Sequence, residues 1–430
     1  MIPTIVISAV TCLTMIMAVL FFPKIRLGKV AVSSYWVVTV IGAIVLFVTG
    51  LVDVEAVGAA LVADTAINPL KILVLFISMT LLSIFLDELG FFRYLANVAL
   101  KRAGTNQMKL FLLLYVMVSI LTVFTSNDII ILSFTPFICY FAKNAHIDPV
   151  PYLAAEFAAA NTWSMALIIG NPTNVYLVTA AGGNFMSYVK VMLVPTLASG
   201  TAAFLCLLLL FRKKLKAPIE ASLEEVVLKD RFSLWVGIVH LAVCTVILAI
   251  GSYIGIEMWL VSFLSAISLL VWTVGISLVR RERPATLAAC LKRAPWELIP
   301  FILSMFVMVE ALNANGVTET ISTLFGAGHL AWKLGISSFL ASNFINNIPM
   351  SVFYSAILPA TASDVAVYAT VVGSNLGACL TPIGALAGIM WSSILRKYHL
   401  KFGYLDFLRI GVTVAVPSLF VALGVLQLIL

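Results

Sequence analysis

The sequence has 430 residues, of which 62% are hydrophobic and 10% are charged. Soluble globular domains are about 45–50% apolar and about 25% charged, so this composition excludes a protein that faces water on all sides and indicates an integral membrane protein. The net charge of +7 does not indicate a nucleic-acid partner, because membrane topology by itself concentrates Lys and Arg on one side of a bilayer.

The sequence contains ten apolar runs that are long enough to cross a bilayer as helices. They occupy residues 2–22, 30–52, 70–86, 152–183, 187–211, 233–254, 257–279, 296–312, 364–395 and 404–428. Two further apolar stretches, 108–141 and 332–359, are interrupted near the middle by polar residues, and we predict that both are re-entrant hairpins. The expected fold is an all-α integral membrane protein with about ten transmembrane helices and two re-entrant hairpins.

The distribution of basic residues predicts the orientation of the chain. If the chain crosses at the ten runs and returns at each hairpin, one side of the membrane holds all of the 26 Lys and Arg residues except Lys71, Lys190 and Lys333. Cytoplasmic loops carry an excess of basic residues, so this side is expected to be the cytoplasm. We therefore expect a multi-pass protein of the cell (inner or plasma) membrane with both termini outside the cytoplasm.

Matched residues at fixed offsets divide the sequence into two similar halves. Pro69 and Pro295 each precede a predicted helix at an offset of 226 residues, and Asn161 and Asn375 recur at an offset of 214 residues. An odd number of crossings separates equivalent points, so the second copy is expected to be inverted relative to the first. Inverted repeats with interrupted helices are a sequence signature of secondary transporters.

The two copies define the expected domain organisation. We predict a first inverted repeat at 1–211, with the hairpin 108–141 and a broken helix at 152–183, a cytoplasmic linker at 212–232, and a second inverted repeat at 233–430, with the hairpin 332–359 and a broken helix at 364–395. Both broken helices are expected near the bilayer midplane, because non-helical backbone at membrane depth is tolerated only where it lines a cavity or is buried in protein.

Polar residues at the tip of the first hairpin suggest a binding function. Ser126, Asn127 and Asp128 are expected to cap the second arm of the hairpin, whose positive dipole end attracts anions. Asp128 could be only a capping residue, but the cost of burying a carboxylate in a membrane favours a role in binding a coupling ion or proton. Glu156 and Glu310 lie near the ends of their spans, and we expect them to be ordinary polar ends at the membrane interface.

Each broken helix contains a signal for a helix start. Gly170 is expected to end one half-helix, and Asn171 followed by Pro172 is expected to begin the next. Thr381 followed by Pro382 predicts a similar start in the second broken helix. Helix N-termini can contact anions, whereas unwound carbonyl groups and helix C-termini suit a cation.

Four motifs together resemble those of a known family. They are Leu86-Asp87-Glu88-Leu89-Gly90-Phe91-Phe92, the tip Ser126-Asn127-Asp128, the tip Asn346-Asn347-Ile348-Pro349, and Gly373-Ser374-Asn375-Leu376-Gly377 through Thr381-Pro382-Ile383-Gly384. The chain resembles the ion transporter superfamily, and specifically its arsenical-pump and anion-permease branch, which is related to divalent anion:sodium symporters. The resemblance implies a homodimer in which a transport domain of hairpins and broken helices moves like an elevator against a fixed scaffold.

The resemblance and the interruptions together select the candidate binding residues. These are Ser126, Asn127, Asp128, Asn161, Asn171, Pro172, Thr173, Asn174, Asn346, Asn347, Asn375, Thr381, Pro382 and Gly384. Asn127 and Asn347 are candidate ligands of a sodium ion. Asp128 is expected to be the chief acidic group of the core. No other cofactor is expected, because the six cysteines show no paired spacing and the four histidines form no metal-binding motif.

We therefore predict a secondary active transporter of a small anion or oxyanion-forming solute, coupled to protons or sodium. Arsenite or antimonite efflux is the leading case, and a cytoplasmic ATPase would then be a candidate partner. The alternatives are a sodium-coupled transporter of citrate-like di- or tricarboxylates, a sodium/proton antiporter and a passive channel. An intramembrane enzyme is disfavoured, because no catalytic constellation is visible.

Overall fold

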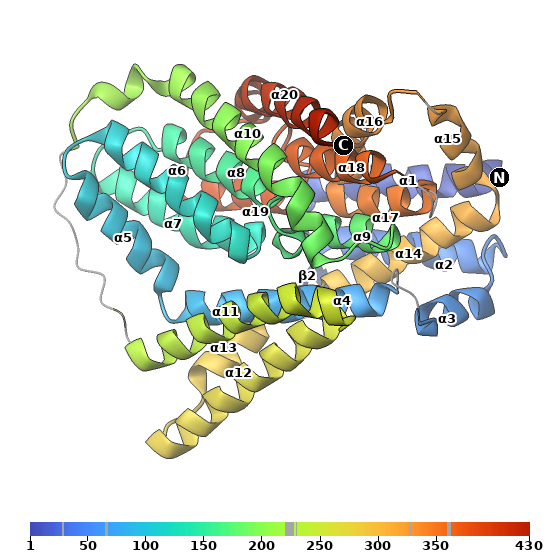
Figure 1. Cartoon of the computed structure of the whole chain (residues 1–430), viewed down its shortest axis with the longest axis horizontal. Helices are drawn as coiled ribbons and strands as arrows, with labels where there is room; N and C mark the ends of the chain where they lie inside the picture. Colours follow the sequence, from blue (N-terminus) through green and yellow to red (C-terminus); the bar gives the residue numbers. More distant parts are fainter. Residues whose placement is uncertain (28–29, 65–67, 220–227, 229, 327, 359–362) are drawn as a thin grey trace.

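The computed structural model describes residues 1–27, 30–64, 68–219, 228, 230–326, 328–358 and 363–430, and it is almost entirely helical (Figure 1). The first half contains α1 (Ile2–Phe21), α2 (Ser34–Val48), α3 (Val54–Val62), α4 (Pro69–Glu88), α5 (Phe91–Ala103), α6 (Gln107–Phe124), α7 (Asn127–Asn144), α8 (Val150–Trp163), α9 (Pro172–Ala180) and α10 (Phe185–Phe211). The second half contains α11 (Arg231–Ile254), α12 (Met258–Arg280), α13 (Ala285–Arg293), α14 (Leu298–Ala314), α15 (Val317–Phe325), α16 (Leu330–Ile345), α17 (Asn347–Ile357), α18 (Asp364–Gly377), α19 (Leu386–Lys397) and α20 (Tyr404–Ile429). Two short 3-10 turns, η1 (Ile168–Gly170) and η2 (Lys214–Lys216), complete the helical elements.

The helices of the two halves correspond in chain order. In this order α1 corresponds to α11, α2 to α12, and so on to α10 and α20. Their packing is also exchanged: α4 packs on α12 while α14 packs on α2, and α9 packs on α17 while α19 packs on α7. In Figure 1 the first hairpin (α6 and α7) lies with α5 on the left, and the second hairpin (α16 and α17) lies with α15 on the right. The two hairpins thus lie on opposite sides of the molecule in this view.

The division of the chain at a linker of residues 212–232 stays a prediction, since 220–227 and 229 lie outside the described residues. Residue 359, the last of the second predicted hairpin, also lies outside them. The remaining hairpin bounds agree with the helices to within a few residues.

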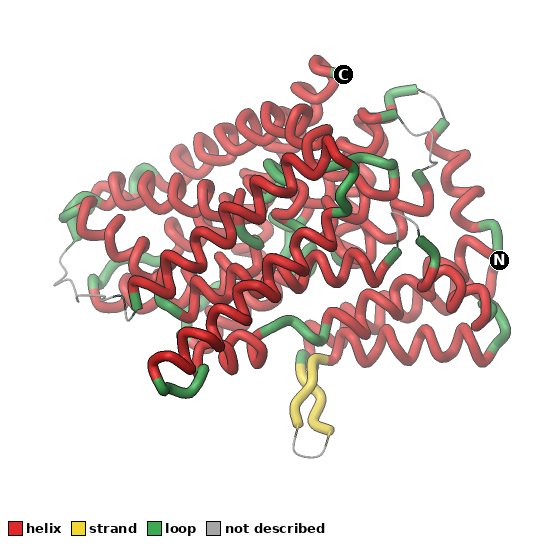
Figure 2. Tube along the Cα trace, turned by 60° about the horizontal axis from the view of Figure 1, so that its bottom comes forward, coloured by secondary structure: helices red, strands yellow, loops and turns green. Residues whose placement is uncertain are grey.

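One prediction of the all-α fold is wrong in detail. The run 30–52 was expected to be one helix, but β2 (Val30–Ser33) precedes α2 and pairs antiparallel with β1 (Lys24–Leu27). Figure 2 shows this small hairpin projecting from the helical body. In β1 the apolar Ile25 and Leu27 alternate with Lys24 and Arg26, which suits a strand, whereas the apolar run of β2 does not distinguish a strand from a helix over such a short distance.

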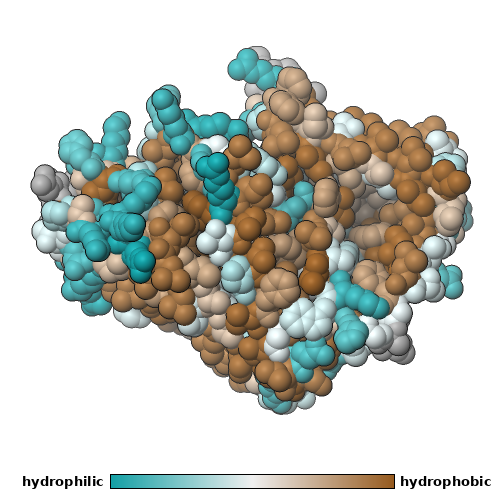
Figure 3. Space-filling model, turned by 90° about the horizontal axis from the view of Figure 1, so that it is seen from above, coloured by the Kyte–Doolittle hydropathy of each residue, from teal (hydrophilic) through white to brown (hydrophobic). Residues whose placement is uncertain are grey.

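Within the described residues, eight helices are long and apolar enough to cross a membrane. Ten spans were expected. The two broken helices consist of shorter pieces and α2 has only 15 residues, so these three expected spans are not among the eight. The hairpin helix α6, which was not counted as a span, is long enough to be included. Figure 3 shows hydrophobic residues over most of one face, with hydrophilic residues gathered mainly at its left end and along its lower right edge. Such a broad apolar surface is suited to lipid contact.

Ion pairs attach both ends of α4 to the second half of the chain. At one end, Nζ of Lys71 lies 2.7 Å from Oε2 of Glu257, and the hydrogen bond from Lys71 also lowers the pKa of the exposed Asp64 carboxyl. At the other end, Nη2 of Arg293 on α13 lies 2.6 Å from Oδ2 of Asp87. These contacts join α4 to α12 and α13, outside the hairpins and broken helices.

Small residues allow α16 and α18 to pack closely, which brings the second hairpin against the second broken helix. A Cβ atom at Gly373 would lie 1.9 Å from Oγ of Ser338 and 2.3 Å from the backbone oxygen of Gly335. A Cβ atom at Gly377 would lie 2.6 Å from the backbone oxygen of Phe339. Close helix contacts through small residues are a common way to pack helices in membranes.

The substitution Gly373→Ala is therefore expected to destabilise the protein by about 1–3 kcal/mol, because backbone atoms must shift to admit the methyl group. Gly275 on α12 is a matched control, since a Cβ atom there meets nothing within 4 Å. Gly275→Ala should be neutral or slightly stabilising, because alanine has the higher helix propensity. Thermal unfolding of both variants in detergent tests this, and equal midpoints would contradict it.

Candidate functional site

Hydrogen-bonded amide side chains connect the first broken helix to Asn375 on α18. Oδ1 of Asn375 accepts from Nδ2 of Asn171 and from Oγ of Ser164, each at 3.0 Å, and Nδ2 of Asn375 donates to Oδ1 of Asn174 at 2.6 Å. Ser374 adds a hydrogen bond to Thr173 at 3.0 Å. All of these side chains are buried. We call this set, with Asn127 and Asn161 described next, the first amide network.

The tip of the first hairpin joins the same network. Nδ2 of Asn127 donates to Oδ1 of Asn161 at 3.0 Å, and Oγ of Ser164 donates to the backbone oxygen of Asn161 at 2.8 Å. Ser126 is 4% exposed, and its Oγ has no hydrogen-bond partner among the described residues. A buried hydroxyl without a partner at the N-terminus of α7 is available to a ligand.

The second hairpin tip contacts the second break through a separate network. Nδ2 of Asn346 donates to the backbone oxygen of Ile383 at 3.0 Å, and the backbone N–H of Asn347 donates to the backbone oxygen of Gly384 at 2.9 Å. Oγ1 of Thr381 donates to Oδ1 of Asn343 at 2.6 Å. We call these residues the second amide network. A Cβ atom at Gly384 would lie 2.7 Å from the backbone oxygen of Gly377, so only glycine fits without a shift.

Asn346 has a strained backbone, with φ +72° and ψ 150°. Such a conformation is nearly restricted to glycine and costs a non-glycine residue about 1–3 kcal/mol. The hydrogen bond to Ile383 and the cap that Oδ1 of Asn346 forms with the N–H of Ile348 at 3.3 Å offset this cost. Strain of this kind concentrates at ligand clamps and switch regions.

The predicted helix starts are confirmed in one case and wrong in the other. Asn171 caps α9 by accepting from the N–H of Thr173 at 3.2 Å, with Pro172 in the first turn. Thr381 and Pro382 do not start a helix, because α19 begins at Leu386 and the hydroxyl of Thr381 is bonded to Asn343 instead.

Two further capping predictions are also wrong. Ser126 occupies the N-cap position of α7 but forms no side-chain cap, whereas Oδ1 of Asn127 accepts from the N–H of Asp128 at 3.0 Å. Gly170 does not end α8, because α8 ends at Trp163. Gly170 instead ends the turn η1, and a Cβ atom at Gly170 would lie 2.4 Å from the backbone oxygen of Ser164. The chain therefore leaves α8 earlier than expected and packs back on itself.

The candidate residues form two neutral clusters with one acidic side chain beside them. Asp128 is half-buried in the first turn of α7 and forms no ion pair with a described basic residue. None of the hydrogen bonds that build either network comes from a Lys or Arg side chain. The described residues contain no group of three His, Cys, Asp or Glu side chains that could hold a metal. Amide and backbone oxygens therefore remain the candidate ligands for a cation such as sodium.

Sequence analysis missed several polar residues of these networks. Ser164, Ser374 and Asn343 were not selected, although Ser374 lies beside Asn375 and Asn343 is one turn before the tip Asn346. Glu156 was expected at the membrane interface, but it is fully buried. The alanine-rich sequence around Glu156 is the signal that could have revealed this, because small residues on all sides of a helix indicate close packing.

The sequence is similar to those of known membrane transport proteins. The model of a family described as citrate transporters matches residues 14–372. The "Arsenical pump membrane protein" of Escherichia coli K12 is 30% identical over 416 residues, which cover 90% of this chain and 92% of that protein. The "Putative arsenical pump membrane protein" of Bacillus subtilis is 24% identical and covers 76% of this chain and 80% of its own length.

A solved structure has a similar fold. The chain superimposes on the Alcanivorax borkumensis YdaH transporter with a TM-score of 0.59 and 14% sequence identity, over 99% of this chain and 98% of that one. At this identity the similarity concerns the fold alone, and it extends over both repeats.

Proposed function

The chain belongs to the citrate transporter family, and on that premise we propose that it is a secondary active transporter that exports arsenite or antimonite. Family membership makes it a multi-pass membrane permease for anions and not an enzyme. The proposal concerns the solute, the coupling and the mechanism. The arsenical-pump relatives suggest arsenite or antimonite as the solute, and the chemistry of the two amide networks suits such a solute.

The neutrality of the site is the observation that carries the proposal. Both networks present amide, hydroxyl and backbone groups, and no basic side chain takes part in the hydrogen bonds that build them. At neutral pH, arsenite is mainly the uncharged acid with three hydroxyl groups, each able to donate and accept a hydrogen bond. Asn side chains offer both functions as well, so such a solute can exchange its water shell for amide contacts without a countercharge.

A sodium-coupled carboxylate transporter is the second candidate. The family description and the three helix N-termini of α7, α9 and α17, which begin next to the networks, favour it. A di- or tricarboxylate, however, carries several negative charges into a buried site, and helix dipoles alone are equivalent to about half a charge each.

For coupling, we propose that Asp128 binds and releases a proton, with sodium at Asn127 and Asn347 as the alternative. We further propose a homodimer in which the hairpins and broken helices move like an elevator, placed in the cell membrane with both termini outside the cytoplasm. If the chain is an arsenical pump, a cytoplasmic ATPase is its candidate partner. We propose no cofactor other than the coupling ion.

A thermal-shift screen of the purified protein tests the solute class. A ligand that binds only the folded state stabilises it by about 2.7 kcal/mol at a concentration of 100 times its dissociation constant. We expect arsenite or antimonite to raise the unfolding midpoint, and citrate, succinate and sulfate to leave it unchanged. If only citrate or succinate raises the midpoint, and only with sodium present, the carboxylate alternative replaces the proposal.

A further inference from the structure

A second carboxyl group is buried in the membrane core, away from the hairpin tips. Glu156 lies in α8, which packs against α6, α7, α10, α18 and α20. The side chain is 0% exposed, and the structure shows no ion pair between it and a described basic residue. Nothing in the two amide networks explains why a carboxyl group should occupy this position.

The two oxygens of Glu156 have unequal surroundings. Oε1 accepts a hydrogen bond from Oγ1 of Thr135 on α7 at 2.8 Å, whereas Oε2 is buried and has no partner among the described residues. Nε1 of Trp391 on α19 is also buried without a partner, and the indole and the carboxyl are close enough to interact. Oε2 is therefore a free acceptor and Nε1 of Trp391 a free donor within interaction range, and a small approach of the two groups would join them by a hydrogen bond.

The charge balance supports the same assignment. An ionised carboxylate with one hydrogen bond and no countercharge is costly in a membrane interior, so the structure fits the neutral acid. The thiol of Cys139 on α7 lies within electrostatic range of Glu156, and a thiol supplies no positive charge to offset an ionised carboxylate. Loss of the proton would place a negative charge on the carboxyl group and make Oε2 a stronger acceptor, which would draw the N–H of Trp391 toward it.

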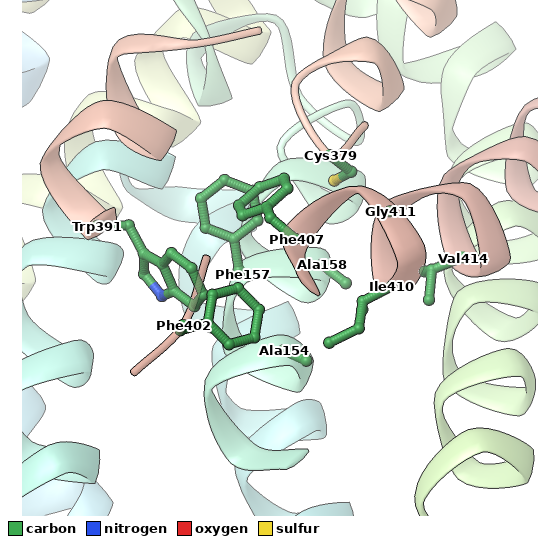
Figure 4. Close-up of a pocket in the computed structure, with 10 residues that line it drawn as sticks. All are labelled: Ala154, Phe157, Ala158, Cys379, Trp391, Phe402, Phe407, Ile410, Gly411 and Val414. Carbon is green, nitrogen blue, oxygen red and sulfur yellow. The ribbon is translucent and has the colours of Figure 1, made fainter. Parts of the chain in front are cut away.

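Trp391 is positioned to transmit such a change. Its ring packs against Phe157 at a centroid distance of 5.3 Å and against Phe407 at 5.5 Å (Figure 4). A small apolar cavity of about 20 Å³, which Cys379 and Gly411 also line, lies beside the ring, so the packing on that side is incomplete. Figure 4 shows the nitrogen edge of the indole on the side away from Cys379.

The helix that carries Trp391 leads directly to the second amide network. α19 begins two residues after Gly384, whose backbone oxygen accepts from Asn347 at the second hairpin tip. A movement of α19 toward α8 would therefore displace the loop that holds this tip. Thr135 belongs to the second arm of the first hairpin, so the same carboxyl also contacts that arm.

We propose that Glu156 is a second proton-binding site of the transporter, whose protonation sets the position of α19 and through it the second hairpin tip. The inference rests on the proposed function, because it assumes a proton-linked transport cycle. The ligand is a proton, and no further reactant is required. Glu156 and Trp391 act as positioning residues and do not touch the solute.

Three variants test the proposal. Glu156→Gln removes the ionisable group at similar size, Trp391→Phe removes the N–H donor and keeps the ring, and Glu319→Gln changes an exposed acid on α15 as a control. Infrared spectra over a pH series report the carboxylic acid directly, without solute or transport. We expect a titrating acid band in the native protein and in Glu319→Gln, and its loss in Glu156→Gln.

Trp391→Phe should shift the titration of this band to higher pH, because the ionised carboxylate of Glu156 loses the N–H donor of Trp391. We expect a shift of about one pH unit, which is a tenfold change in the acid dissociation constant of Glu156. In proteoliposomes, Glu156→Gln should release about half as many protons per solute moved, because Asp128 still carries one, with unchanged arsenite-induced thermal stabilisation. A band that does not titrate, or unchanged proton release in Glu156→Gln, overturns the inference. Absence of any arsenite or antimonite stabilisation in the native protein instead overturns the proposed function, while the infrared titration still tests Glu156.

Discussion

Replacing Asp128 with Asn is expected to abolish solute transport driven by a pH gradient, while the protein still folds and binds its solute. Asn has the same shape as Asp but cannot bind and release a proton at working pH. Asp128 is half-buried and forms no ion pair with a described basic residue, so removing its charge breaks no described salt bridge. The favourable interaction of its charge with the N-terminus of α7 amounts to only about 0.3–1 kcal/mol.

Flux into proteoliposomes, measured with an imposed pH gradient and separately with a sodium gradient, gives the result. The pH-driven rate of Asp128→Asn should fall at least about a hundredfold, equivalent to nearly 3 kcal/mol of lost coupling. Glu319→Gln, on the exposed face of α15, should transport as the native protein does. Normal pH-driven flux in Asp128→Asn would refute the coupling role of Asp128, and sodium-driven flux that is lost in the same variant would assign Asp128 to sodium instead.

The start of α9 could be predicted from the sequence because this break depends on local chemistry. Asn171 followed by Pro172 begins α9 as expected, since the Asn side chain reaches a backbone N–H only two residues away. Asn346 likewise caps α17 through the N–H of Ile348. A capping residue and a proline suffice to interrupt a helix wherever the surrounding protein can satisfy the freed backbone groups.

The misassigned residues depend on partners that are distant in the sequence. Thr381 precedes Pro382 as a cap would, but its hydroxyl bonds to Asn343, 38 residues away, so the helix starts later. Glu156 was placed at the interface from its position along the span, without weighing the alanine-rich sequence around it. Its burial follows from five surrounding helices, and helical periodicity in one sequence cannot reveal how many neighbours a helix has.

The asymmetry between the two repeats could not be predicted either. Asn161 and Asn375 occupy equivalent positions, yet Asn161 bonds to the hairpin tip of its own repeat and Asn375 bonds to the broken loop of the other repeat. The same side chain at a duplicated position thus has two environments. Asn375 consequently forms the amide–amide hydrogen bonds between the repeats, and its removal should have the larger effect.

Asn375→Ala is expected to destabilise the protein by about 2–4 kcal/mol, because buried polar atoms that lose their partner each cost about 1–3 kcal/mol. The substitution leaves Nδ2 of Asn171 without its acceptor and removes the 2.6 Å hydrogen bond to Asn174. Ser164 keeps its hydrogen bond to the backbone of Asn161, which limits the loss. Chemical unfolding in detergent measures the change in the free energy of unfolding.

Ser133→Ala on α7 is the matched control, since the hydroxyl of Ser133 bonds only within its own helix, to the backbone oxygen of Ile129 at 2.8 Å. Its loss should change the free energy of unfolding by less than about 1 kcal/mol. Asn375→Asp places a carboxyl group in a fully buried site, where the neutral acid keeps an acceptor for Asn171 and a hydroxyl donor for Oδ1 of Asn174, so its stability should fall as the pH rises. If Asn375→Ala is as stable as Ser133→Ala, the first amide network does not hold the repeats together, and the loop of the first broken helix must be positioned by packing alone.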